Sequence, residues 1–229
     1  MSTDIVELVR TRASNPETIH DMAMGLSPAP KIYPAVTADV IAAAEKELGF
    51  ALPPLLKRVY TEIGNGGFGP GYGLNGLSAG LDEEGYPASL EALYAALREE
   101  PPQGFSSWPE GFIPLCTWGC AIDSYVDCTD AKYAVSVFNP ESHCLDSGNV
   151  TATLTTADGE VIELDSLEEL GLTSPGASSE KPASGLVRHK ETLEEWLAAW
   201  ARGVDLWTEM EALWSGGDQS AWQSGGHVN

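Results

Sequence analysis

Two short amphipathic helix patterns lead directly into a glycine-rich loop between residues 36 and 76, and this stretch constrains the fold more than any other. Apolar side chains recur at one-turn spacing over 38–48 and again over 53–63, which predicts two helices that each bury one stripe. Pro53 and Pro54 suit a first helical turn, where the missing N–H is not needed. We expect Gly64 and Asn65 to end the second helix, because glycine adopts the left-handed conformation of a helix exit.

The loop that follows invites a nucleotide-binding interpretation, which the flanking patterns do not support. The dinucleotide fingerprint works only where a strand enters the loop and a helix follows it, so that helix N–H groups face a pyrophosphate. Here a helix enters the first match, no helix pattern follows the second, and no Gly-Lys-Ser/Thr sequence is present. We therefore expect no cofactor. The two matches are Gly64/Gly66/Gly69 and Gly71/Gly73/Gly76.

A G-x-S-x-G sequence around Ser78 raises the alternative of a serine hydrolase. A nucleophile elbow requires a strand before the serine and a helix directly after it. The residues after Ser78 instead form an acidic turn pattern at 81–87, and neither His143 nor His189 lies in a sequence that suggests a catalytic base. We favour a turn of small residues and assign no catalytic residue, keeping the hydrolase as a minor alternative.

The segment AEKELGFALPPLLKRVYTEIGNGGFG resembles the opening motif of the SUKH superfamily, which includes Smi/Knr-like fungal cell-wall regulators and bacterial immunity proteins. The shared pattern is an A-E-x-x-L-G helix, a Leu-Pro step, a second helix with an aromatic residue near its end, and an Asn-Gly-Gly exit. Residues 112–115 and 118–120 resemble the first central strand of that family. The resemblance covers 36–170 and implies an α+β fold with a central, mostly antiparallel sheet flanked by helices, together with a protein-binding role.

Charge narrows the class of partner. The chain of 229 residues has 34 acidic and 12 basic residues, a formal net charge of −22. Such a surface repels phosphate backbones and anionic lipid, so we expect neither nucleic-acid nor membrane binding. Between Arg58 and Lys132 the sequence has eleven acidic residues and only one basic residue, Arg98. An acidic surface here would attract a basic partner and speed its capture.

The cysteines indicate neither a metal site nor a disulfide framework. Cys116, Cys120, Cys128 and Cys144 contain no C-x-x-C pair, and their spacings with His143 fit no usual structural-zinc pattern. We expect small, buried, reduced thiols. The sequence has no basic start followed by an apolar run, and no stretch approaches the ~18 apolar residues of a membrane span. We therefore expect a cytoplasmic protein.

Pattern and composition divide the chain into five parts. Strand patterns occur at 111–118, 121–127 and 133–138, and Asp158-Gly159 indicates a hairpin between 150–156 and 160–164. Ser89 is expected to cap a helix after the loop, and Thr192 with Glu195 forms a capping box for a tryptophan-rich helix that Gly203 bends or interrupts. The parts are an N-terminal helix and arm (1–35), a SUKH-like α+β domain (36–170), an exposed loop or linker (171–190), a C-terminal helix packing on the domain (191–214) and a mobile tail (215–229).

The favoured function is a non-catalytic immunity protein that binds and neutralises a basic, nuclease-type toxin. A regulatory scaffold for a cellular protein is the alternative. Phe68 and Tyr72 are expected to be aromatic anchors, because rings in a desolvated contact dominate such interfaces. The other possibility for Phe68 is that it folds over the helix pair. The predicted contact residues are Gly66, Gly67, Phe68, Tyr72, Asp82, Glu83, Glu84, Asp123 and Asp127.

Overall fold

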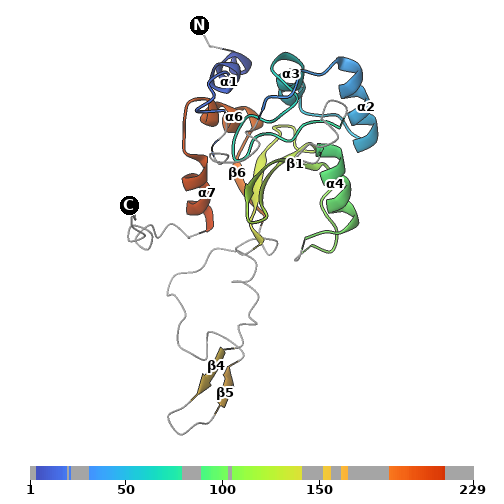
Figure 1. The fold of residues 1–229 in the computed structure, drawn as a ribbon. Helices are drawn as coiled ribbons and strands as arrows, with labels where there is room; N and C mark the ends of the chain where they lie inside the picture. Colours follow the sequence, from blue (N-terminus) through green and yellow to red (C-terminus); the bar gives the residue numbers. More distant parts are fainter. Residues whose placement is uncertain are drawn as a thin grey trace.

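The computed structural model describes residues 4–19, 21, 31–78, 89–102, 105–140, 152–155, 161–164 and 186–214. The helices are α1 (Ile5–Ala13), α2 (Ala38–Leu48), α3 (Pro54–Glu62), α4 (Leu90–Glu99), α6 (Leu193–Ala201) and α7 (Leu206–Trp214). The strands are β1 (Phe112–Gly119), β2 (Ile122–Asp127), β3 (Val135–Phe138), β4 (Ala152–Thr155), β5 (Val161–Leu164) and β6 (Leu186–Lys190). The fold is α+β, as the sequence predicts (Figure 1).

The helix pair forms where the apolar periodicity places it, but its second exit differs from the prediction. α2 ends at Gly49, which is left-handed at φ 86°, and α3 begins after Pro53. Gly64 does not have a positive φ. It must be glycine because a Cβ there would lie 2.4 Å from Ile32 Cγ2 and 2.6 Å from the Tyr33 carbonyl oxygen. Gly64, two residues after the end of α3, is therefore required by the close approach of the chain at Ile32 and Tyr33 rather than by helix termination.

The central sheet has the order β1-β2-β3-β6, and every neighbouring pair is antiparallel. β6 lies within the range predicted to be an exposed loop or linker, and residues 171–185 of that range lie outside the described part of the chain. Val187 pairs with Val137 and Arg188 with Ser136, so β6 completes the sheet beside β3. The strand is short and partly polar, which explains why its pattern did not indicate a strand. The predicted hairpin is confirmed as a separate two-stranded sheet of β4 and β5.

Helices cover the two faces of the sheet, with α4 on one side and α7 on the other (Figure 1). Alternate residues of β2 face opposite sides. The Tyr125 ring packs against Trp108, 4.7 Å between centroids, on the α4 side. Ser124 accepts a 2.9 Å hydrogen bond from Trp118 Nε1 on the other side, where the Trp118 ring lies 6.1 Å from Trp207 of α7. We call the side of the sheet covered by α4 the groove face and the side covered by α7 the sealed face.

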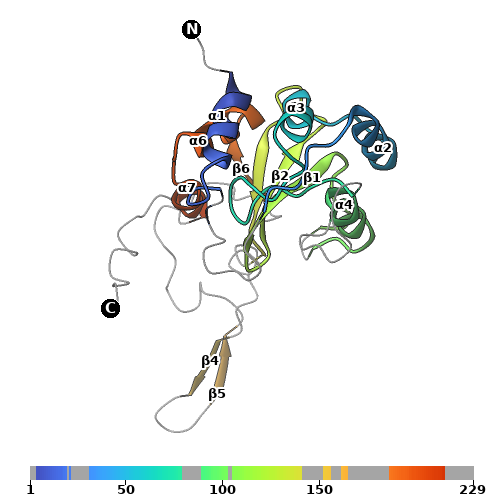
Figure 2. The same ribbon diagram turned by 45° about the horizontal axis from the view of Figure 1, so that its top comes forward.

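The C-terminal tryptophan-rich segment is two helices rather than one. Thr192 caps α6, its hydroxyl accepting from the Glu195 N–H at 3.0 Å, and Gly203 separates α6 from α7 with a φ of 82°. Trp196 and Trp200 are fully buried, as the stripe predicts. The segment packs back onto the sheet through contacts of both helices with β6, and α1 lies against α6 (Figure 2).

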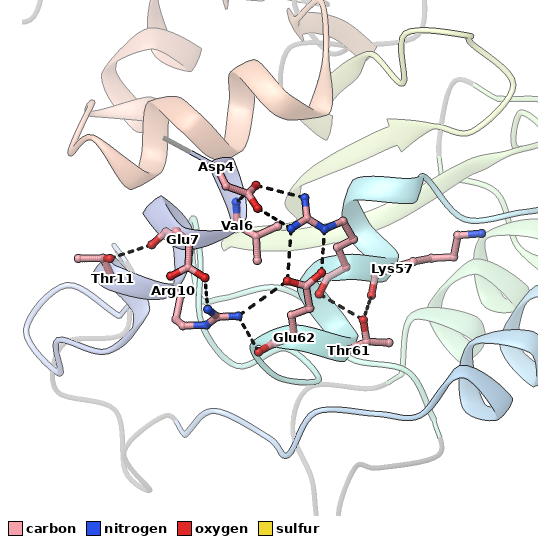
Figure 3. Close-up of polar contacts among 9 residues, drawn as sticks. Asp4, Val6, Glu7, Arg10, Thr11, Lys57, Thr61 and Glu62 are labelled. Atoms are coloured by element: carbon pink, nitrogen blue, oxygen red, sulfur yellow. Dashed lines mark hydrogen bonds and ion pairs between the residues drawn. The ribbon is translucent and has the colours of Figure 1, made fainter. Parts of the chain in front are cut away.

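Two arginine clusters attach α1 to the rest of the molecule. In the first, Arg58 of α3 joins Asp4 at 2.6 Å and Glu62 at 2.7 Å, while Arg10 of α1 donates to the Glu62 carbonyl (Figure 3). These side chains are exposed, so each pair contributes little stability. In the second, the more buried Arg12 donates to the Trp200 carbonyl oxygen and to Asp21, and its guanidinium lies 4.8 Å from the Trp200 ring centroid.

Candidate functional site

The glycine-rich loop follows α3, precedes α4 in the chain and lies against β1, and it is internal rather than an exposed surface. Gly66 and Gly67 are buried with positive φ, and a Cβ on Gly67 would lie 2.0 Å from the Lys31 carbonyl oxygen. Phe68 is fully buried in the core, with its ring edge beside Gly64. Of the two possibilities for Phe68, folding over the helix pair matches this structure, because the ring has no exposed surface to offer a partner.

The remaining predicted contact residues lie in different places. Tyr72 is half-buried, its N–H donates to the Thr117 carbonyl at 3.0 Å, and its ring lies beside Gly119. Asp127 is also half-buried and organises the turn after β2, its Oδ1 accepting from the N–H and hydroxyl of Thr129. Asp123 lies elsewhere on β2, in a groove. Asp82, Glu83 and Glu84 lie outside the described residues.

The groove lies between α4 and the β1–β2 hairpin, on the groove face of the sheet, and encloses about 470 Å³. α4 supplies an apolar wall, the strands supply hydroxyl and carboxylate groups, and Asn75 comes from the end of the glycine-rich segment. The charged lining residues within the described chain are both acidic. The groove is lined by Asn75, Leu93, Ala96, Leu97, Glu100, Pro114, Thr117, Ala121, Asp123 and Tyr125.

Asp123 is the carboxylate set most deeply into the groove. Burial raises its pKa above the usual value, while hydrogen bonds from Thr117 and Tyr125 oppose that rise. The Tyr125 hydroxyl lies 3.3 Å from Asp123 Oδ2. Among the described residues no lysine, arginine or histidine forms an ion pair with Asp123. The groove therefore presents a partly desolvated negative group that no side chain in the described part of the chain neutralises.

A comparison with models of protein families assigns the chain to a family. The model of the SMI1 / KNR4 family (SUKH-1) matches residues 35–167. The chain belongs to this family. The matched range begins before α2 and ends after β5, close to the predicted 36–170, and it contains every residue that lines the groove. No curated protein matches the chain.

Family membership supports a protein-binding role of the immunity-protein or SMI1/KNR4 type, in a family that is generally non-catalytic. The structure adds that this SUKH-1 domain is completed by segments outside the match. β6 extends the matched sheet, α6 and α7 both contact β6, and α1 packs against α6. None of the helices within the described ranges has the combined length and apolar character that a membrane span needs.

Within the described ranges, the Ser78 alternative gains no catalytic partner. The Ser78 hydroxyl donates to Glu91 Oε1 at 3.1 Å, and its N–H donates to the same carboxylate. Glu91 is 3% exposed in the first turn of α4, so this contact joins the end of the glycine-rich segment to that helix. The nearest ionisable partner of His189 is Glu209, 3.5 Å away on α7. The Ser78 hydroxyl and the His189 ring thus lie beside different carboxylates.

The thiols follow the prediction in part. Cys116 is buried, and burial raises its pKa well above the usual value; burial also raises the pKa of the half-buried Cys128, to about 12. Cys120 is exposed, which corrects the expectation that it is buried. It lies with Ala121 at the tip of the β1–β2 hairpin, where both residues have positive φ, as the favoured two-residue hairpin turn requires. Cys144 and His143 lie outside the described residues.

Several groove residues escaped the sequence analysis. Asn75, Glu100 and Tyr125 were not singled out, because their common location depends on how α4 packs across β1 and β2. Tyr125 carries only the ordinary strand pattern, and Glu100 follows a helix in which acidic residues are common. Asp123 was singled out from the acidic bias, but the sequence contains no signal that distinguishes it from Asp127.

Proposed function

We propose that this SUKH-1 protein is a non-catalytic binding module that occupies a basic protein, as an immunity protein does with its toxin. The observation that carries the proposal is the groove, where the described charged lining residues are both acidic and Asp123 has no cationic partner within the described chain. A formal net charge of −22 adds a long-range attraction for a basic surface. A nuclease toxin is a fitting partner, because carboxylates can replace substrate phosphates in its cleft.

The contact surface we propose surrounds the groove. It includes Asp123 and Tyr72, whose ring lies beside Gly119 at the hairpin end. Asp82, Glu83 and Glu84 stay contact residues predicted from the sequence alone and lie outside the described residues. Asp127 contributes charge from the other end of β2. Phe68 is left out, because it is fully buried.

A direct test begins by identifying the partner. The full chain, carrying an affinity tag, is used to capture partners from cells of its natural source, and the co-purifying protein is identified by mass spectrometry and then produced separately. We expect a basic protein whose association rate falls at least about tenfold between ~50 mM and ~500 mM salt. Association that does not depend on salt contradicts a basic partner.

A second measurement separates a toxin from a cellular partner. If the partner is a toxin, producing it alone stops growth, and co-production of this protein restores growth. The regulatory alternative, which the SMI1 / KNR4 family name supports, expects a partner that is harmless by itself. In both cases Ser78→Ala leaves binding and growth unchanged, because no step depends on a serine nucleophile. Loss of protection with retained binding in Ser78→Ala contradicts the non-catalytic proposal.

A further inference from the structure

We propose that the groove between α4 and the β1–β2 hairpin is a subsite for one arginine side chain of the partner. This inference rests on the proposed function and deepens it, because it assigns a residue type to one contact. Asp123 would pair with the guanidinium group, and the apolar wall of α4 would hold the methylene stem.

The lining suits a long side chain that is apolar along its stem and charged at its tip. Leu93, Ala96 and Leu97 form a continuous apolar strip on α4. Pro114 of β1 and Ala121 of the hairpin tip line the opposite side of the groove. Arginine and lysine bury such stems against apolar surface while the charged head reaches a polar group. A purely apolar side chain would leave the Asp123 carboxylate desolvated without compensation.

The carboxylate itself favours a cation. Burial disfavours the charged form of Asp123, and the Tyr125 hydroxyl at 3.3 Å is a weak compensating donor. A guanidinium placed beside it would stabilise the charged form and supply several N–H donors in one plane. The Asn75 side chain adds a further acceptor, its Oδ1, because its amide nitrogen is the atom that donates to the Pro114 carbonyl, at 3.2 Å.

The end of α4 adds to the negative potential of the groove. Leu97 lies in the last turn of the helix and Glu100 is its C-cap residue, so the C-terminal end of the helix dipole lies at the groove. That end of the helix favours a nearby cation. A divalent metal ion fits less well, because the described residues contain no group of three histidine, cysteine or acidic side chains that could hold one.

The probe is N-acetyl-arginine methylamide, titrated into the ¹⁵N-labelled full chain and followed by NMR chemical shifts. We expect saturable shifts at groove residues, and at least about tenfold weaker binding to Asp123→Asn. Asp127→Asn is the matched control: it removes the same charge from the same strand and keeps an oxygen acceptor for the Thr129 turn, so binding should remain within about twofold. The neutral citrulline analogue should not bind.

A second pair of variants tests the location without touching the carboxylate. Ala96→Arg places an arginine in the groove from the exposed surface of α4, and we expect it to block the probe. Ala95→Arg adds the same charge one position along the helix, at an exposed residue that does not line the groove, and should leave probe binding intact. Equal effects of the two variants would overturn the location, as would equal probe binding by wild type and Asp123→Asn.

Failure of this inference is distinguishable from failure of the proposed function. If the purified partner binds in a salt-dependent manner and Asp123→Asn binds it as tightly as wild type, the subsite is wrong and the binding module stands. If the probe N-acetyl-arginine methylamide binds in the groove but no basic partner exists, the proposed function is wrong. Support for both requires that Asp123→Asn weaken the purified partner and the probe, while Asp127→Asn weakens neither by more than about twofold.

Discussion

The two faces of the central sheet differ in how completely helices close them. On the sealed face, Trp118 lies beside Trp207 and bonds Ser124, and His189 is buried against α7 with only 2% of its side chain exposed. On the groove face, α4 packs against β1 and leaves about 470 Å³ open, with Asp123 of β2 in the lining. Residues of one strand therefore have opposite roles: Ser124 is part of a packed core, and its neighbour Asp123 faces a groove.

This difference indicates that stability depends mainly on the sealed face of the sheet, whereas the proposed binding depends on the groove face. Large aromatic side chains fill the space under α6 and α7, so substitutions there leave cavities. The groove is already open, and a substitution in its wall removes less packing.

Truncating a sealed-face tryptophan should be the most damaging change. Trp118 is 2% exposed, and Trp118→Ala removes its ring contact with α7 and its bond to Ser124. We expect the free energy of unfolding to fall by about 3–5 kcal/mol in denaturant titrations. Leu97→Ala, in the half-buried groove wall, is the comparison and should cost at most ~1 kcal/mol. Similar losses for the two variants would remove the distinction between the faces.

Acid should destabilise the sealed face through His189. Burial lowers the pKa of His189 to about 4, with Lys190 adding to the effect and Glu209 opposing it. Below pH ~6.5 the unfolded chain takes up a proton that the folded chain refuses, so stability falls until the pH reaches about 4. We expect this one group to account for about 2–3 kcal/mol of that loss.

The measurement is the free energy of unfolding between pH 7 and pH 4 for wild type and His189→Gln. The variant should show a shallower decline over that interval, since glutamine cannot take up the proton in either state. Parallel curves for the two proteins would show that His189 does not titrate in this way.

The attachment of α1 to α6 should have an intermediate effect. Arg12 bonds the Trp200 carbonyl and Asp21 and stacks on the Trp200 ring. Arg12→Ala therefore removes the cation paired with the partly buried Asp21 carboxylate and one of the donors to the Trp200 carbonyl, which keeps the Gly203 N–H. We expect a loss of about 1–2 kcal/mol. Arg10→Ala, in the exposed cluster of Figure 3, should cost at most ~0.5 kcal/mol by the same unfolding assay. The reverse order would mean that the exposed cluster holds α1.

Neutralising Asp123 should have the smallest effect on stability, and of opposite sign. Because burial raises the pKa of Asp123 in the fold, protonation favours the folded state, and wild-type stability declines as pH rises through that pKa. Asp123→Asn lacks this decline, so at pH 7 we expect its unfolding free energy to equal or slightly exceed that of wild type. A clear loss of stability in Asp123→Asn would show that the charge stabilises the fold rather than serving a ligand.

Local patterns were sufficient for most helices and for three strands of the sheet. The apolar spacing in α2 and α3, the Ser89 cap of α4 and the Asp-Gly hairpin of β4 and β5 depend on contacts between near neighbours in sequence. β6 is the exception, because a short, partly polar segment becomes a strand only when β3 offers its edge.

The sequence predicted the candidate site less well than it predicted the fold. The acidic bias pointed to Asp123 and Asp127 together, yet only Asp123 faces the groove. Phe68 was misplaced as an anchor because a glycine-rich loop usually lies at the surface, whereas this loop is covered by the chain around Tyr33 and Leu74.

By itself the sequence determined the family, the order of most elements and the negative charge, because these depend on local periodicity, motif and composition. Tertiary structure alone decided that the loop is buried, that β6 closes the sheet and that one carboxylate of β2 lies in a groove. Those features depend on which distant segments pack together, and close packing is settled by shape over the whole chain rather than by neighbours in sequence.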